Sequence, residues 1–161
     1  MPTTDPHLLD PSHLPTPFSA DEIRAGCPAG RTVRSIVVEG EAAPYIHIVR
    51  FVAADADGAD QETWDETLDG EPLRGPSQRR STWLQFQGHA SMPAATTVRE
   101  PESIVIPAGR FDCLRYRRTE CDGVSTFWFA MAAPGQPLKF EERALDGTLV
   151  YSSTCISDTR E

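Results

Sequence analysis

Alternation of apolar and polar residues dominates the sequence from residue 31 onwards. The segments RTVRSIVVE (31–39) and YIHIVRFVA (45–53) are rich in β-branched and aromatic residues and end at turn formers, which is typical of β-strands. The second segment is apolar on both faces, so that it is either covered on both sides or part of a tightly curved sheet.

Asp-Gly pairs follow the alternating segments at several points, and each one indicates a hairpin because both residues tolerate positive φ. The four pairs are Asp57-Gly58, Asp69-Gly70, Asp122-Gly123 and Asp146-Gly147. We therefore assign the chain to the mainly β (α+β) class. The expected architecture is a single curved antiparallel sheet, a half-barrel or barrel-like meander, with one or two short helices.

Two of these turns also predict strand registers. A two-residue turn at Asp146-Gly147 pairs Phe140 with Ser153, Glu142 with Tyr151 and Arg143 with Val150. The same turn at Asp122-Gly123 pairs Arg117 with Trp128, which would allow a cation–π contact. In the hairpin around residues 104–113 two loops are open, Pro107-Ala108-Gly109 or Ala108-Gly109 alone. We favour the second, because it places Ile106 beside Phe111.

Helical signals are confined to two short segments. In residues 18–26, Ser19 and Glu22 form a capping-box pattern. In residues 81–92, Trp83, Phe86 and Ala90 follow helical spacing, and Ser81 is the expected cap. Residues 1–17 carry five prolines and little apolar pattern. We interpret them as a flexible Pro-rich arm, followed by a single β-rich domain over residues 18–158.

Composition narrows the range of partners. The chain has 161 residues and a net charge of −9, which argues against a nucleic-acid partner because phosphate binding needs a basic face. The sequence has no transmembrane segment and no signal-peptide pattern at its start. Its four cysteines lack CxxC spacing, and we expect free thiols and a cytoplasmic location.

The C-terminal half resembles a known group of proteins. Residues 95–157, with VIPAGRFDCLRY followed by STFWFAMAAPGQPLKFEE, are similar to uncharacterised bacterial half-barrel proteins of the lipoprotein-carrier and lipoprotein-localisation fold. The resemblance rests on Pro107, Gly109, Phe111, Trp128, Pro134 and Lys139. It implies a curved sheet with helices in its concave face and an apolar concavity able to hold an acyl chain. Members of this group are usually exported.

Motifs that would name a reaction, a metal or a cofactor are missing, so we predict no catalytic residue, no metal site and no cofactor, and favour a non-enzymatic role. The predicted function is binding of an apolar small molecule, acyl chain or lipid in the concave face. The candidate pocket residues are His47, Trp83, Phe127, Trp128, Leu138, Phe140, Glu142 and Tyr151. Two alternatives stay open: a barrel-type cyclase or isomerase, and a protein-interaction domain with a filled core. The oligomeric state is not predicted.

Overall fold

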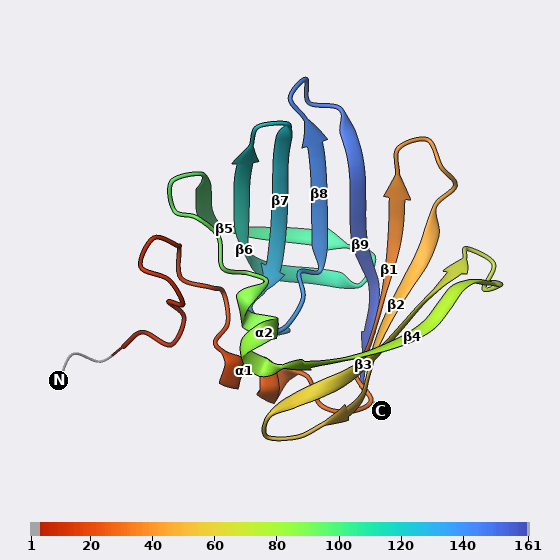
Figure 1. Ribbon diagram of the computed structural model, residues 1–161. Helices are drawn as coiled ribbons and strands as arrows, with labels where there is room; N and C mark the ends of the chain where they lie inside the picture. Colours follow the sequence, from red (N-terminus) through yellow and green to blue (C-terminus); the bar gives the residue numbers. More distant parts are fainter. Residues whose placement is uncertain (1–3, 161) are drawn as a thin grey trace.

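The computed structural model describes residues 4–160. They form two short helices and one nine-stranded antiparallel sheet (Figure 1). In chain order the elements are α1 (Ala20–Gly26), β1 (Thr32–Glu39), β2 (Tyr45–Ala54), β3 (Gly58–Thr67), β4 (Pro72–Thr82), α2 (Trp83–Gly88), β5 (Thr97–Ile106), β6 (Gly109–Glu120), β7 (Gly123–Ala130), β8 (Lys139–Ala144) and β9 (Leu149–Thr159).

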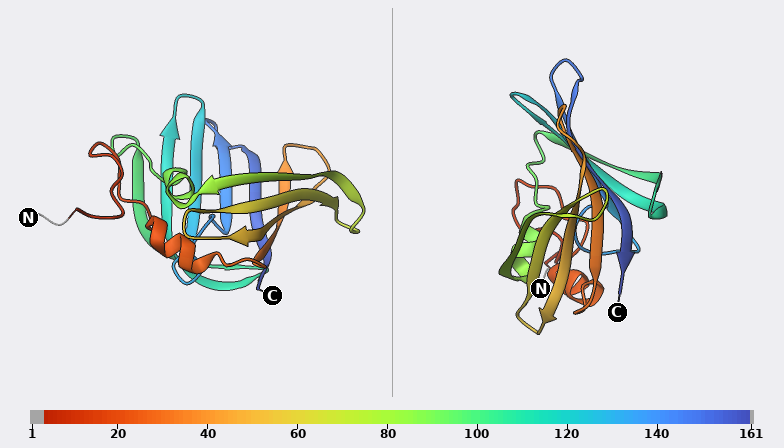
Figure 2. Two further views of the ribbon diagram at one scale, coloured as in Figure 1. Left: turned by 60° about the horizontal axis from the view of Figure 1, so that its bottom comes forward. Right: turned by 90° about the vertical axis from the view of Figure 1, so that its right-hand side faces the viewer.

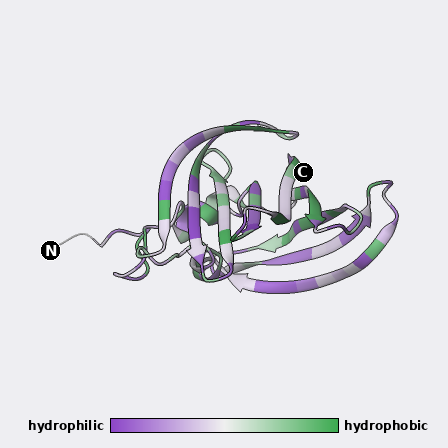
Figure 3. Ribbon diagram, turned by 90° about the horizontal axis from the view of Figure 1, so that it is seen from above, coloured by the Kyte–Doolittle hydropathy of each residue, from purple (hydrophilic) through white to green (hydrophobic). Residues whose placement is uncertain are grey.

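The sheet is an open meander with one long-range pairing. Its strand order is β4-β3-β2-β1-β9-β8-β7-β6-β5, so β9 pairs with β1 and joins the two halves of the chain. The strands β4 and β5 are the two free edges. The β3–β4 hairpin projects from the sheet and is largely hydrophilic (Figure 3). The predicted fold class, a mainly β curved antiparallel sheet with short helices, is confirmed.

A first hydrophobic core lies between the helices and the sheet face that bears them, which we call the concave face (Figure 2). Phe51, Tyr116 and Phe129 enter this core from the sheet, and Ile23 and Trp83 enter it from the helices. All five side chains are at most 5% exposed, so the helices close this part of the concave face. The rest of that face extends beyond the helices.

A second core lies on the opposite face, because neighbouring strand residues point to opposite sides of a sheet. Trp128 belongs to this core, whereas Phe129 belongs to the first. The tip of the β5–β6 hairpin bends behind the sheet and covers the second core (Figure 1). There the amide of Ala108 donates a hydrogen bond to the carbonyl of Cys155 in β9. The central strands are therefore buried on both faces at one end. In residues 45–53, the two-sided apolar pattern is matched by burial of the adjacent residues Ile48 and Val49.

Local signals place both helices. The capping box of Ser19 and Glu22 is present at the start of α1, as predicted. At α2 the box is formed by Thr82 and Gln85, so the predicted cap at Ser81 is wrong by one residue. Ser81 is instead a buried residue of β4. Each box satisfies two backbone donors that a helix start leaves open.

The register between β8 and β9 is confirmed over most of its length. Phe140 faces Ser153 and Glu142 faces Tyr151. Nearer the turn a bulge shifts the pairing, so that Arg143 faces Leu149 and not Val150. The loop is one residue longer than predicted, because the hydrogen bonds that close it join Ala144 to Gly147 and to Thr148.

The register between β6 and β7 differs from the prediction by two residues. Arg115 faces Trp128, and the turn consists of Cys121 and Asp122. Gly123 is the first residue of β7 and has no positive φ. A Cβ atom at Gly123 would lie 2.1 Å from the carbonyl oxygen of Arg143, so glycine is needed for close approach of β8. Because the shift is an even number of residues, every side chain stays on its predicted face.

The β5–β6 hairpin also differs from both predicted loops. Ile106 pairs with Gly109, which leaves Pro107 and Ala108 as the turn and places Ile104 opposite Phe111. Proline presets the φ angle that the first central turn position needs, which accounts for this choice.

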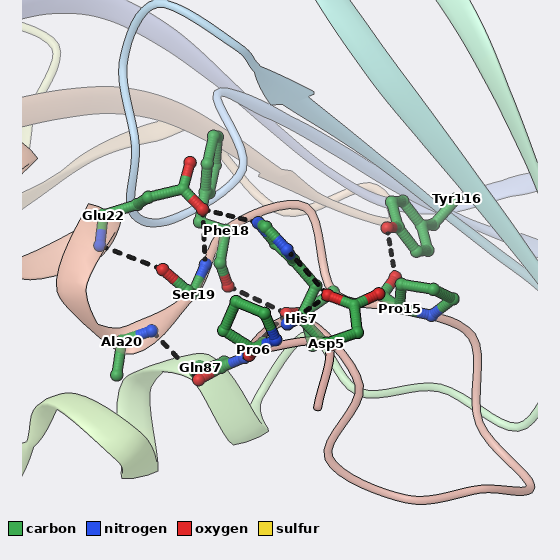
Figure 4. A network of polar contacts seen from close by, with 11 residues as sticks. Asp5, Pro6, His7, Pro15, Phe18, Ser19, Ala20, Glu22, Gln87 and Tyr116 are labelled. Carbon is green, nitrogen blue, oxygen red and sulfur yellow. Dashed lines mark hydrogen bonds and ion pairs between the residues drawn. The ribbon is translucent and has the colours of Figure 1, made fainter. Parts of the chain in front are cut away.

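Residues 4–17 lie against the helices and the sheet (Figure 4). The side chain of Gln87 in α2 is 2% exposed and donates hydrogen bonds to the carbonyl of Pro6 and the hydroxyl of Thr16, at 2.8 and 3.0 Å. The Tyr116 hydroxyl donates to the carbonyl of Pro15 at 2.6 Å. These contacts connect the segment to the first core, while the predicted domain boundary between residues 17 and 18 stays a prediction.

The two histidines of this segment also have partners. Nε2 of His7 lies 2.5 Å from Oε1 of Glu22, and its Nδ1 lies 3.1 Å from Oδ1 of Asp5. Nδ1 of His13 lies 2.8 Å from Oγ of Ser91. The segment is thus held at both ends by side chains as well as by backbone.

A buried arginine joins the first helix to the last strand. The Arg31 side chain, 1% exposed, forms a two-pronged ion pair with Asp158, with N···O distances of 3.0 and 2.9 Å. Its remaining terminal nitrogen donates to the carbonyls of Gly26 and Pro134, at 3.1 and 2.5 Å. One guanidinium thus connects the end of α1, the start of β1, the loop before β8 and the end of β9.

We expect Arg31→Gln to lower the free energy of unfolding by about 3–5 kcal/mol, because it leaves Asp158 without its buried partner. Arg160→Gln is the matched control. Arg160 also contacts the Asp158 carboxylate and the Gly26 carbonyl, but it is 43% exposed, so a loss below about 1 kcal/mol is expected. Urea unfolding of both variants measures the difference. Equal losses would show that burial of Arg31 is not what matters.

We expect Gly123→Ala to destabilise the protein by about 1–3 kcal/mol, because the added methyl group forces β7 and β8 apart. Gly88→Ala in α2 is the control, since a Cβ at that position meets no atom within 4 Å. It should leave stability unchanged or raise it. A neutral Gly123→Ala in thermal unfolding would contradict the close approach of the two strands.

Candidate ligand-binding face

Four aromatic side chains form a continuous row on the concave face, which we call the aromatic row: Phe127, Phe129, Phe140 and Tyr151. The ring centroids of Phe127 lie 6.3 Å from Phe129 and 4.7 Å from Phe140, and those of Phe140 and Tyr151 are 5.6 Å apart. Phe129 is buried in the first core, whereas the other three are half-buried. The row therefore runs from the core under the helices to the open part of the face.

Strand pairing explains why these rings meet. Phe127 of β7 faces Phe140 of β8 directly, and side chains at facing positions lie about 4.5–5.5 Å apart at Cβ. Tyr151 of β9 lies diagonally across from Phe140, within reach of a large ring. Because β7, β8 and β9 are consecutive in the sheet, their facing residues build one surface.

A polar row borders the aromatic row at its open end. Ser125, Glu142, Tyr151 and Glu39 face one another in turn across β7, β8, β9 and β1. Among residues 4–160, the Glu142 carboxylate forms no ion pair and no side-chain hydrogen bond. Burial raises the pKa of Tyr151, and the nearby carboxylates of Glu39, Glu142 and Asp65 raise it further. Tyr151 is therefore a neutral phenol in an acidic environment.

A chain of polar contacts continues from this row across β2, β3 and β4. Nδ1 of His47 lies 2.6 Å from Oδ1 of Asp65, whose other oxygen accepts a hydrogen bond from Nε of Arg74 at 2.7 Å. The Arg74 guanidinium lies 4.5 Å from the ring centroid of Tyr45, and the Tyr45 hydroxyl donates to Glu39 at 2.7 Å. Burial and this hydrogen bond raise the pKa of Tyr45 to about 12.

The structure brings five of the eight predicted pocket residues onto the concave face: His47, Phe127, Phe140, Glu142 and Tyr151. Trp128 lies in the second core on the opposite face, and Leu138 belongs to the same core. Trp83, the first residue of α2, is buried in the first core. Leu138 lies in the loop before β8 and packs in the second core, so it is not part of the aromatic row.

The predicted stacking partner of Trp128 is also different. The ammonium group of Lys139 lies 4.8 Å from the Trp128 ring centroid, whereas Arg117 faces Thr126. Sequence reasoning missed Asp65 and Arg74, because the strands β3 (GADQETWDET) and β4 lack the apolar alternation that marks a strand. Glu39 and Tyr45 lie in predicted strands, but their part in these contacts follows only once β3 and β4 are placed. The available signal was the Asp57-Gly58 turn, which pairs β3 with β2.

Five hollows formed by the described residues are open to solvent, and none of these five is lined by Phe127, Phe140 or Tyr151. One hollow, of about 420 Å³, opens at the end of β7 and β8 and is lined in part by Ser125 and Glu142. A second, about 410 Å³, lies on the opposite face among arginines and Thr126. The aromatic row is thus an open surface, bordered at one end by a polar hollow.

Residues 4–160 contain no group of three or more His, Cys, Asp or Glu side chains arranged to hold a metal ion. Within the same residues, no helix has the length and apolar composition needed to cross a membrane.

Comparison with known proteins shows similarity at the level of fold. No protein-family model matches the chain, and no curated protein matches it in sequence. Two solved structures resemble it. One is described as a "putative lipoprotein" from Parabacteroides distasonis, with a TM-score of 0.56. The other is described as a "putative exported protein" with a YmcC-like fold from Bacteroides fragilis, with a TM-score of 0.54. Each is 10% identical, over 83% of this chain and 97% of the other.

These neighbours support the expected half-barrel resemblance only at this distant level. They also contradict the cytoplasmic location expected from the sequence, since one is described as a lipoprotein and the other as an exported protein. The cytoplasmic expectation rested on cysteine spacing and on the residues at the start of the chain. Neither property reports the compartment in which a folded β-sheet domain works, and the expectation is withdrawn.

The His47–Asp65–Arg74 contacts generate a prediction on pH. Burial raises the pKa of the Asp65 carboxyl, but the hydrogen bonds from His47 and Arg74 outweigh it and hold the pKa below its usual range. A depressed pKa in the folded state means that this carboxylate adds stability above the unfolded pKa of about 4, and that the contribution is lost as the pH falls through the folded pKa.

We therefore expect Asp65→Asn to lower the urea midpoint at pH 7, and to lose less stability than the wild type between pH 7 and pH 3. Asp69→Asn, which neutralises an exposed carboxylate in the β3–β4 turn, should follow the wild type at both values. If Asp65→Asn and the wild type lose the same amount on acidification, the carboxylate does not carry this contribution.

Proposed function

We propose that the protein binds an apolar small molecule or acyl chain along the aromatic row. The observation that carries this proposal is the continuity of the row: rings 4.7–6.3 Å apart extend from the first core onto an open, half-buried surface. Half-buried aromatic side chains leave apolar surface in contact with water, and a ligand gains free energy by covering that surface.

The free energy expected from apolar burial is compatible with a ligand that has a short alkyl chain. Burial of one methylene group contributes about 0.8 kcal/mol, so that six methylenes along the row contribute about 5 kcal/mol before the cost of ordering the ligand. That range corresponds to weak, reversible binding, which suits an open face better than an enclosed cavity does. The fold similarity to a described lipoprotein and a described exported protein is compatible with this role.

A protein-interaction role is the second candidate, favoured by a different observation. Both cores are filled by side chains, and the tip of the β8–β9 hairpin exposes Leu145, Leu149 and Val150, with Leu145 71% exposed. The two roles predict different binding surfaces, the hairpin tip or the aromatic row. The cyclase or isomerase alternative stays a prediction, since no described contact distinguishes it.

We expect the neutral apolar dye N-phenyl-1-naphthylamine to bind the row and to gain emission on leaving water. Dye emission is a better readout than the fluorescence of Trp83 and Trp128, because these two side chains lie in the two cores and not on the row. Phe140→Ala should weaken dye binding about tenfold, as expected for the loss of a large apolar contact. Circular dichroism should confirm that the variant is folded.

Leu145→Ala is the control, because it removes an exposed apolar side chain from the hairpin tip of the same strand pair. It should leave dye binding unchanged. If Leu145→Ala weakens binding and Phe140→Ala does not, the dye sits on the tip, and the interaction-domain candidate takes the place of the proposed function.

A further inference from the structure

We propose that the ligand of the aromatic row carries a cationic nitrogen, a protonated amine or quaternary ammonium group, which is held between Glu142 and Glu39 at Tyr151. This inference rests on the proposed function and names the chemical class of its ligand. The aromatic row would hold the apolar part of such a ligand, and the polar row at its open end would hold the charged group.

The geometry places two carboxylates on either side of one phenol ring. Glu142 of β8 and Glu39 of β1 are the residues that face Tyr151 of β9 from its two neighbouring strands. Facing side chains in a sheet lie about 4.5–5.5 Å apart at Cβ, so a group seated over the ring is within reach of both carboxylates. A cation at that position also meets the π-face of Tyr151, an arrangement that favours ammonium ligands.

Neither carboxylate has a positive partner of its own within residues 4–160. Glu142 forms no ion pair, and Glu39 accepts only the hydroxyl of Tyr45. The nearest cations of this face are paired with other carboxylates. Arg74 binds Asp65, and its charge also acts on Glu39. Arg118, which faces Ser125, binds Glu120 at 3.0 Å and lies over the Phe127 ring, and its Nε has no hydrogen bond. Two carboxylates without a cation beside an apolar surface make that surface selective for positive charge.

A further feature of the same place is a hydroxyl without a protein partner, on a residue that is itself largely buried. Ser125 faces Glu142 from β7, is 5% exposed and lines the hollow of about 420 Å³ together with Glu142. Its hydroxyl forms no hydrogen bond within the described part of the chain. Because Ser125 lines this hollow, its hydroxyl has an open hydrogen-bonding position for a polar group of a guest.

Glu141, the residue before Glu142 on β8, has a carboxylate that is paired with cations. Glu141 points to the opposite face and contacts two cations, Lys139 at 3.6 Å and Arg143 at 3.3 Å. Glu141 and Glu142 therefore differ in one respect that matters here, since one is neutralised by the protein and the other is not. This difference provides a control one residue away from the test.

The experiment measures displacement of N-phenyl-1-naphthylamine by three ten-carbon competitors at pH 7, each below its micelle concentration. Decylamine, decanol and decanoate share the chain and differ in the charge of the head group. We expect decylamine to compete best and decanoate worst. In Glu142→Gln the advantage of decylamine over decanol should fall about fivefold, the size expected for one partly exposed ion pair with a cation–π contribution.

Glu141→Gln should retain the decylamine preference, and Glu39→Gln should reduce it as Glu142→Gln does. Raising the salt concentration from 20 to 500 mM should weaken decylamine binding and leave decanol unchanged. Circular dichroism and urea midpoints should show that all three variants fold.

The outcomes separate the two proposals. Equal competition by all three compounds, or a preference for decanoate, would overturn the cationic head group and leave the apolar site standing. Loss of the decylamine preference in Glu141→Gln but not in Glu142→Gln would move the charge selectivity to the other face and overturn the inference as well. Absence of dye binding and of any displacement would remove the proposed function itself, and the head-group proposal with it.

Discussion

The buried ion pair of Arg31 and Asp158 is the interaction on which the arrangement of this protein depends. The sheet is a meander whose first and last strands become neighbours, so β9 must reach β1 across most of the chain length. Arg31, just before β1, binds Asp158 near the end of β9 and also donates to carbonyls at Gly26 and Pro134. Isolated charges are costly to bury, and this one is compensated by four directed contacts that hold only when all the partner segments are in place.

Closure at that point fixes which part of the concave face the helices can cover. With α1 tied to the end of β9, the helices lie over Phe129 and Tyr116 and leave the rest of the aromatic row open. The second core, covered by the β5–β6 hairpin, supports the same strands from behind.

The sequence pattern predicted the faces of the strands better than it predicted their partners. Alternation alone places Phe127, Phe140 and Tyr151 on one side of the sheet, and the misassigned β6–β7 turn did no harm because it shifted the register by an even number of residues. The turn was misplaced because Gly123 was interpreted as a positive-φ residue, whereas it is needed for contact with β8. Trp128 was assigned to the pocket because alternation cannot say which face is concave. Leu138 was assigned to it because the alternation of β8 was extended into the loop before that strand.

Long-range pairing was beyond the reach of these patterns. Nothing near Arg31 marks Asp158 as its partner, because the two are 127 positions apart. The strands β3 and β4 could not be recognised from apolar alternation. β3 is rich in charged residues, and β4 is exposed along nearly its whole length and therefore has no apolar face. The contacts of His47 with Asp65 and of Glu39 with Tyr45 follow only once those strands are in register.

The free edges of the sheet have a further consequence. A sheet that does not close into a barrel has two edge strands. Each edge strand has unpaired backbone groups to which a strand of a second chain could hydrogen-bond. In this protein both edge strands contain proline: Pro101 in β5, and Pro72 and Pro76 in β4. Each proline lacks the backbone N–H group that could pair with an added strand. The concave face can therefore stay accessible to small guests while the molecule resists growing sideways into fibres.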